Sequence, residues 1–133
     1  TAALATGIDA LYCAPSIFYA TQQLAPRTQG YPLEEINDYL RAAPQQSEPV
    51  WRTLSYFDLQ HFAATVKAQT MLVTGNDKDF FSPAVMQPLV TALGDKVTTY
   101  QSAHSSYRDG VHQERWLSQR FGFAEPLLPP HWR

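Results

Sequence analysis

Two side chains that could exchange a proton follow two apolar runs of the chain. Asp79 comes shortly after the run at residues 71–74, and His104 comes shortly after the run at residues 97–100. A carboxylate beside an imidazole fixes the ring tautomer and stabilises the imidazolium, as general acid–base and nucleophilic catalysis require. Open α/β sheets place their chemistry at the rim formed by the carboxyl ends of the strands. Asp79 and His104 are therefore a strand-end acid followed by a strand-end histidine, the two groups that an acid–base pair needs.

Other histidines and carboxylates compete for these roles. Asp77 would replace Asp79 if the loop were shifted by two residues, and Asp79 itself could simply cap the following helix. The alternative for His104 is an ordinary solvated loop histidine. We expect His112 to lie on a helix in contact with solvent, and His61 to lie on the apolar face of a helix as a hydrogen-bonded core histidine.

A nucleophile for this pair is harder to find. Ser105 and Ser106 are too close in sequence to His104 for the usual geometry of a nucleophile and its base. Cys13 is the only cysteine, and it stands in an apolar run, where a thiol usually behaves as a small buried hydrophobe. None of these three residues is the expected attacking group.

Aromatic residues and histidines elsewhere in the chain favour ordinary structural roles. Four aromatic side chains could line an acyl or sugar pocket, but core packing is the preferred interpretation; they are Phe80, Phe81, Tyr107 and Trp116. The histidines are scattered at spacings that match no metal-ligand motif. We expect no metal site and no cofactor.

Three strands should position the acid and the base. Short apolar or β-branched runs predict strands at residues 8–14, 70–74 and 96–101, the first stopped by Pro15 and the second by Gly75. Helical patterns of about ten residues lie between and after these runs. Strands that alternate with helices imply right-handed crossovers and a parallel sheet, and hence the α/β class.

The helices are predicted from their start and stop signals. Ser16 should cap a helix that Pro26 stops, and Pro32 should open a second one over residues 32–41. Ser82 followed by Pro83 should begin a helix that ends at residue 93. A last helix is expected over residues 111–121.

The middle of the chain is predicted from prolines and one capping pattern. Residues 43–49 hold two prolines and two glutamines and are expected to form a connector. Ser55 and Asp58 have the spacing of a capping box, so a helix should start there, with Phe57, Phe62 and Val66 along the face that packs on the sheet.

Length, composition and charge set outer limits. The chain has 133 residues, of which 44% are hydrophobic, and a formal net charge of −2. It is long enough for one core, and it lacks the clustered cations that nucleic acid or an anionic membrane surface would need. Its apolar runs fall well short of the roughly 20 residues of a spanning helix. The single Cys13 excludes an internal disulfide and does not fix the cellular compartment.

The amino terminus suggests that more chain precedes it. Thr1 is not a start methionine, and residues 1–5 have the composition of the end of a helix. We therefore expect this sequence to be a piece of a longer chain.

Several landmarks together resemble one enzyme family. They are the strand that ends at Ala14-Pro15, the segment Tyr31-Pro32-Leu33-Glu34-Glu35-Ile36-Asn37-Asp38-Tyr39-Leu40, the segment Leu54-Ser55-Tyr56-Phe57-Asp58, the stretch 75–83 with Asp79 four residues before its proline, and Ala103-His104. In this order they resemble the carboxyl-terminal half of an α/β-hydrolase of the acetyl xylan esterase and cephalosporin C deacetylase family. The resemblance covers residues from about 4 to 122.

This resemblance implies a partial α/β-hydrolase fold. Residues 1–133 would form a single α/β domain of about three parallel strands with flanking helices, and residues from about 16 to 50 would form a lid-like helical insertion. By position, Asp79 is similar to the acid of the family's catalytic triad and His104 to its base. The family's nucleophilic serine sits in a Gly-x-Ser-x-Gly turn. That motif and its oxyanion donors do not occur in these residues.

The function implied by the resemblance is therefore incomplete. The chain would be a fragment or subunit of a carboxylic ester hydrolase, with small acetyl esters such as those of carbohydrates as its substrate class, and would be inactive alone. The alternative is a non-catalytic remnant of the fold that binds or dimerises. An unpaired strand edge invites either a second copy or a complementary chain as partner.

Overall fold

The computed structural model contains one three-stranded parallel sheet. It describes residues 2–15, 17–124, 128–129 and 131. The strands are β1 (Ala10–Cys13), β2 (Gln69–Thr74) and β3 (Val97–Gln101), in the spatial order β1-β2-β3. All three predicted strands and the parallel α/β class are confirmed.

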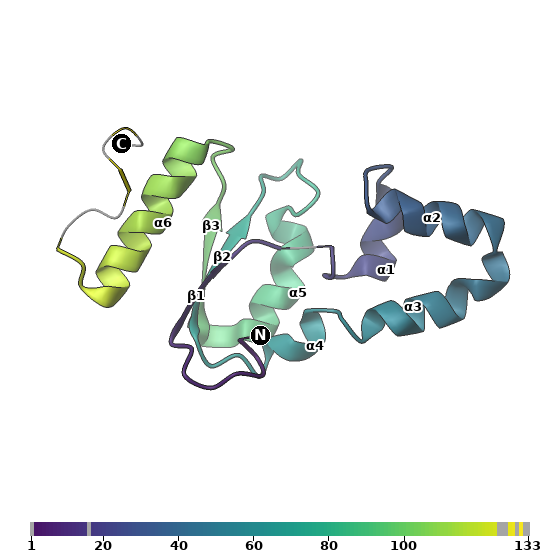
Figure 1. Cartoon of the computed structure of the whole chain (residues 1–133), viewed down its shortest axis with the longest axis horizontal. Coiled ribbons are helices and arrows are strands. Elements are labelled where there is room, and N and C mark those ends of the chain that lie inside the picture. The colour runs from purple at the N-terminus through teal and green to yellow at the C-terminus, as the bar shows by residue number, and fades with distance from the viewer. Residues whose placement is uncertain (1, 16, 125–127, 130, 132–133) are drawn as a thin grey trace.

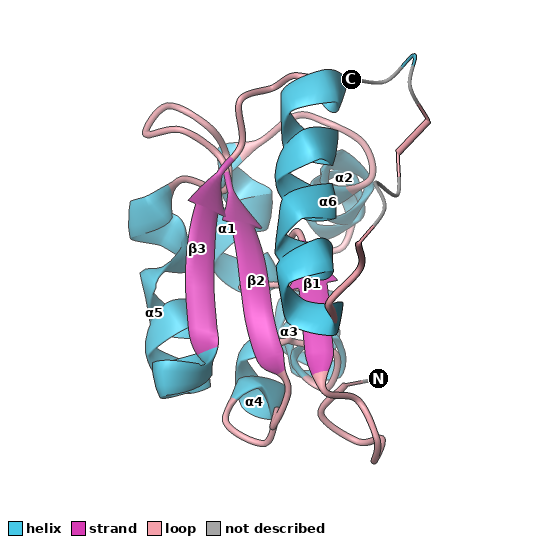
Figure 2. Cartoon of the chain, turned by 90° about the vertical axis from the view of Figure 1, so that its left-hand side faces the viewer, coloured by secondary structure: helices cyan, strands magenta, loops and turns pink. Residues whose placement is uncertain are grey.

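The central strand β2 is the most buried of the three. Thr70, Met71, Leu72 and Thr74 are buried, whereas no residue of β1 or β3 is. This burial follows from its position, because β2 has a strand on each side and a helical layer on each face (Figures 1 and 2). Its continuous apolar and β-branched sequence fits a strand covered on both faces.

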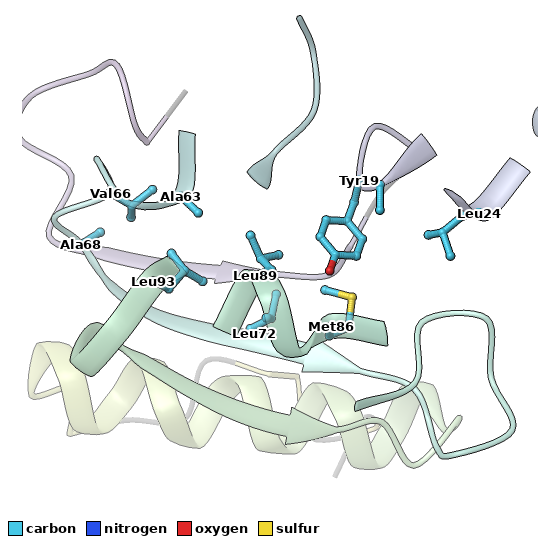
Figure 3. Close-up of a cluster of buried hydrophobic side chains, with 10 residues drawn as sticks. Tyr19, Leu24, Ala63, Val66, Ala68, Leu72, Met86, Leu89 and Leu93 are labelled. Carbon is cyan, nitrogen blue, oxygen red and sulfur yellow. The ribbon is translucent and has the colours of Figure 1, made fainter. Parts of the chain in front are cut away.

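Helix α5 (Pro83–Leu93) packs on one face of the sheet and builds the main core. It begins after Ser82 and ends before Gly94, at the predicted bounds. Its buried side chains meet Leu72 of β2 and the ring of Tyr19, whose hydroxyl donates a hydrogen bond to the Val85 carbonyl at 2.6 Å (Figure 3). The buried cluster consists of Tyr19, Ala20, Leu24, Ala63, Val66, Ala68, Leu72, Met86, Leu89 and Leu93.

Helix α6 (Ser106–Phe121) covers the opposite face of the sheet (Figure 2). It begins five residues earlier than predicted, because Ser105 caps it by accepting a hydrogen bond from the Arg108 amide. The prediction of a solvated His112 is wrong. The His112 ring stacks on Tyr100 of β3 with centroids 3.5 Å apart, and its Nδ1 lies 3.5 Å from the Tyr12 hydroxyl. Packing of α6 on the sheet leaves His112 only partly exposed to water.

The segment between β1 and β2 is helical but differs in detail from the prediction. The first helix, α1 (Thr21–Leu24), has only four residues and continues into the 3₁₀-helix η1 (Ala25–Arg27), which contains Pro26. The proposed cap, Ser16, lies outside the described residues. Helix α2 (Leu33–Ala42) follows Pro32 as predicted. These helices extend away from the sheet on the α5 side (Figure 1).

The predicted connector at residues 43–49 is helical, although it adds no buried residue to the core. This stretch contains the 3₁₀-helix η2 (Pro44–Gln46) and the start of helix α3 (Ser47–Ser55). Both prolines lie in the first turn of their helices, where the backbone N–H groups have no intrahelical partner and a proline costs little. These prolines therefore mark the starts of helices, whereas the prediction had treated them as helix breakers.

The predicted capping box is also wrong. Ser55 is the last residue of α3, and its hydroxyl donates to the Arg52 carbonyl. Asp58 instead accepts a hydrogen bond from the Gln60 amide and precedes a helix of only four residues, α4 (Gln60–Ala63). His61 is exposed, not a core residue.

The amino-terminal residues and the lengths of the helices complete the description of the fold. Residues 2–4 form a turn where a helix end was predicted. Among the described helices, none combines the length and the apolar character needed to cross a membrane.

Leu72 should be a main contributor to stability. Its side chain is 1% exposed at the centre of the sheet, so Leu72→Ala removes buried methyl groups and leaves a cavity. We expect the free energy of unfolding to fall by about 2–5 kcal/mol, measured by urea denaturation. Leu4→Ala is the matched control, because Leu4 is 79% exposed and its loss should change stability by less than about 0.5 kcal/mol. Equal effects of the two changes would contradict this core.

Acid should weaken the packing of α6. Burial, and to a lesser extent Arg115, lowers the pKa of His112 below its ordinary 6.5, although Asp109 opposes the shift. The unfolded chain therefore binds a proton at a higher pH than the folded one. The stability that neutral His112 contributes is complete above pH 6.5 and is lost as the pH falls below that value.

The measurement is the urea-unfolding free energy of wild type and His112→Phe between about pH 5 and 7, the range over which a histidine titrates. Phenylalanine keeps an aromatic ring against Tyr100 but cannot titrate. We expect the wild type to lose stability relative to the variant as the pH falls. A constant difference would contradict the lowered pKa of His112 in the folded chain.

Candidate functional site

Asp79 and His104 lie in contact at the carboxyl ends of β2 and β3. The distance between His104 Nε2 and Asp79 Oδ2 is 2.6 Å. The strands that precede these residues are parallel neighbours, and Thr74 pairs with Gln101 at the end of the ladder. The two loops therefore leave the sheet at the same height. Both side chains remain accessible, with 29% of Asp79 and 57% of His104 exposed.

The loop after β2 is folded around the Asp79 carboxylate. The Asn76 amide donates to Asp79 Oδ2 at 2.6 Å, and the Asp79 amide donates back to the Asn76 carbonyl at 3.0 Å. The loop is closed at its base by the Gly75 amide, which donates to the Phe81 carbonyl. The Asn76 amide is the main reason why the pKa of Asp79 is lowered, with the His104 contact adding to it and partial burial opposing it.

Gly75 is required at this position by space. A Cβ atom added to Gly75 would lie 2.4 Å from the Asp79 Cβ and 2.5 Å from its Oδ2. The Asp79 side chain thus occupies the space that a side chain at residue 75 would fill. The glycine that sequence analysis treated as a strand end is also part of the site.

His104 is held in an unusual backbone conformation. Its φ is 51°, in the left-handed region that costs a non-glycine residue roughly 1–2 kcal/mol. Its amide donates to the Ser102 hydroxyl at 3.0 Å, and the Ser102 amide donates to the Thr74 carbonyl at 2.8 Å. The loop that carries the imidazole is therefore anchored directly to the end of β2.

The ring nitrogen in contact with the carboxylate defines the tautomer. Because ionised Asp79 accepts only, the contact requires a proton on His104 Nε2 and leaves Nδ1 as the basic nitrogen of the neutral ring. Asn76 Nδ2 lies 3.3 Å from the same Nε2. Since Nε2–H already donates to Asp79, this amide contact is a close approach and not a second hydrogen bond.

The competing candidates lie outside this pair. Asp77 is exposed, and Asp79 is the loop carboxylate that contacts His104. Burial raises the pKa of the Cys13 thiol in β1, which disfavours the nucleophilic thiolate. Ser105 is the cap of α6, and Ser106 is the first residue of that helix.

The aromatic residues are divided among core, surface and the opposite face. Phe80 and Phe81 pack against the buried cluster and meet edge to face with centroids 5.0 Å apart. Trp116 packs on Tyr12 beneath α6, and Tyr107 is half exposed. Core packing is thus the role of Phe80 and Phe81. No group of three or more potential metal-ligating side chains occurs within the described part of the chain.

Sequence analysis missed one residue beside the site. Asp109 in the first turns of α6 accepts hydrogen bonds from the loop that carries His104, at distances of 2.7–3.4 Å. Its signal was available, because an acidic residue favours the start of a helix. The helix had been predicted to begin at Val111, which left Asp109 in a loop.

An apolar cavity of about 420 Å³ lies beside β1, away from the acid–base pair. It is bounded by side chains of β1, α4, α5 and the segment before β1, among them Leu11, Cys13, Phe62 and Leu89. Neither Asp79 nor His104 lines it. The cavity therefore lies against β1 and β2 and not at the rim of the sheet that carries Asp79 and His104.

Comparison with known protein families shows which family this chain resembles. The family model described as Acetyl xylan esterase (AXE1) matches residues 1–115 of the 133-residue chain. The match includes β1, β2 and β3 together with both residues of the acid–base pair. A search of curated protein sequences found no match to this chain.

The space at Gly75 provides a direct test of the site. Gly75→Ala should push the Asp79 side chain away and destabilise the protein by about 1–3 kcal/mol, as overpacking does. Histidine NMR spectra should then lose the Asp79–His104 hydrogen bond. In the control, Gly110→Ala in α6, the added Cβ makes only an ordinary 3.6 Å contact, so helix propensity should raise stability by up to about 1 kcal/mol. An unchanged bond in Gly75→Ala would refute the close approach.

Proposed function

The chain belongs to the acetyl xylan esterase family, and from this premise we propose that it supplies the acid and the base of a Ser-His-Asp triad. Asp79 is the acid and His104 the base. The family is one of α/β-hydrolases that cleave carboxylic esters. The proposed substrate class is a small acetyl ester, such as an acetylated carbohydrate. The observation that carries the proposal is the 2.6 Å contact between His104 Nε2 and Asp79 Oδ2.

The proposed chemistry is acyl transfer in two steps. Neutral His104 takes the proton of an attacking hydroxyl as that oxygen bonds to the ester carbonyl, and it then returns the proton to the departing alcohol. Water next attacks the acyl-enzyme and loses a proton to His104, which gives that proton to the nucleophile oxygen as its bond to the acyl carbon breaks and acetic acid leaves. Asp79 stays ionised throughout, a role that its lowered pKa supports, and stabilises the imidazolium.

The ring of His104 must match this role. In the usual triad Nδ1–H faces the carboxylate and Nε2 faces the nucleophile. Here Nε2 faces Asp79. We propose that the side chain turns when the nucleophile segment docks, so that Nδ1 faces Asp79 and Nε2 faces the hydroxyl. Exposure of more than half of the His104 side chain leaves room for that rotation.

The nucleophile is proposed to come from a segment outside these residues. No Gly-x-Ser-x-Gly motif occurs in the sequence, and Cys13, Ser105 and Ser106 are poorly suited to replace it. The segment would belong either to the same polypeptide or to a complementary chain. In the same proposal, residues 1–133 form one domain and residues from about 16 to 50 form a lid-like insertion. Helices α1 and α2 lie in this insertion and project from the sheet (Figure 1).

A second candidate function is non-catalytic binding or self-association. It is favoured by the outer edge of β1, which pairs only with β2 among the described strands, and by the apolar cavity beside it. Under this alternative the chain dimerises through that edge. Sedimentation of the purified chain separates monomer from dimer directly.

Activity measurements test the catalytic proposal. The purified chain should neither react with a fluorophosphonate probe nor hydrolyse p-nitrophenyl acetate faster than free imidazole. When the nucleophile segment is supplied, hydrolysis should appear, and His104→Ala or Asp79→Ala should reduce kcat by about 10⁴–10⁶. Asp77→Ala is the matched control and should retain full activity. Labelling of the purified chain alone, or full activity of His104→Ala, would overturn the proposal.

A further inference from the structure

The Asp109 carboxylate collects hydrogen bonds from four groups on one short segment. Oδ1 accepts from two of them and Oδ2 from the other two, so both oxygens are used. The donors are the Tyr100 hydroxyl at 2.7 Å, the Ala103 amide at 2.8 Å, the Ser102 hydroxyl at 2.7 Å and the Ser105 amide at 3.4 Å. All of them belong to the end of β3 or to the loop that presents His104.

His104 is linked to Asp109 through Ser102. The Ser102 hydroxyl accepts from the His104 amide at 3.0 Å and donates to Asp109 Oδ2 at 2.7 Å. The residue before His104, Ala103, is bonded to Asp109 through its amide. The left-handed backbone of His104, with φ 51°, is thus held from both its own amide and its neighbour's.

The chemistry of this position suits a carboxylate. An ionised carboxylate accepts up to four hydrogen bonds and donates none, which matches the four donors. Partial burial opposes ionisation of Asp109, but the bonds from Ala103, Ser102 and Tyr100 outweigh it and lower its pKa. Asp109 also lies in the first turn of α6, where the positive end of the helix dipole favours a negative charge. An asparagine would have one acceptor oxygen and could not serve all four groups.

We propose that Asp109 is the positioning residue of the acid–base pair, fixing residues 102–105 so that the His104 ring meets Asp79. Asp109 contacts neither Asp79 nor the His104 ring through any described hydrogen bond, so its action is indirect. An effect of Asp109 on catalysis rests on the proposed function, whereas its effect on the position of the His104 ring can be tested without it.

The experiment is NMR of the purified chain with ¹⁵N-labelled histidine. In the wild type His104 should be in the Nε2–H tautomer, and the Ala103 amide should exchange slowly with water. In Asp109→Asn the ring should shift toward the tautomer mixture of a free histidine, and exchange at Ala103 should accelerate by about tenfold or more, the effect of losing one charge-assisted bond. Ser102→Ala removes the bridge between the His104 amide and Asp109 but leaves the bonds from Tyr100, Ala103 and Ser105, so it should have a smaller effect on the tautomer.

The control is Gln113→Gly, at an exposed position of the same helix. It lowers helix propensity without touching the carboxylate, so it should leave both the tautomer and the Ala103 amide unchanged. An unchanged His104 tautomer in Asp109→Asn, or an equal change in Gln113→Gly, would overturn the positioning role.

Failure of the proposed function would look different. In the complete hydrolase, Asp109→Asn should lower kcat and leave KM unchanged, because it moves the base and not the ester. If His104→Ala remains active, the proposed function fails, and the NMR result for Asp109 still stands. If His104→Ala is inactive while Asp109→Asn keeps wild-type kcat, the positioning inference fails alone.

Discussion

The parallel pairing of β2 with β3 is the interaction on which the site depends. Five residue pairs align the strands, from Thr70 with Val97 to Thr74 with Gln101, and the Ser102 amide extends the ladder by one more bond to the Thr74 carbonyl. Two loops far apart in sequence thereby start from adjacent points. A one-residue slip of the register would displace one loop from the other and turn the side chains of the shifted strand to the opposite face, so the site depends on this pairing register.

The parts predictable from sequence are those determined by local chemistry. The run at residues 70–74 has no polar interruption, and Ser82 with Pro83 marks a helix start, so β2 and α5 were found at nearly their true bounds. Once a parallel order was inferred, the two strand ends had to share a rim. The prediction that Asp79 and His104 lie together rested on this topology and on the family resemblance, and their catalytic roles are a proposal.

The parts that could not be predicted depend on contacts between distant segments. His112 reads as an ordinary helix residue until α6 is laid across the sheet, where Tyr100 becomes its neighbour. Asp109 has four partners that only the folded loop assembles. Which ring nitrogen of His104 contacts Asp79 depends on the rotation of the side chain, and the spacing of residues in the sequence does not determine that rotation. Pro44 and Pro49 suggested a loop, but proline is common both at the start of a helix and where a helix is broken.

The outer strand β1 is held less firmly than the rest of the sheet. Its four residues are all only partly buried, it has one described strand neighbour, and an apolar cavity adjoins it. Loss of β1 would remove the packing of Leu11 and Cys13 on the core cluster, but it would break none of the β2–β3 residue pairs and not the hydrogen bond between His104 and Asp79. Local opening at β1 breaks no described hydrogen bond of the Asp79 or His104 side chain, so a complementary segment could associate with this edge without displacing that pair.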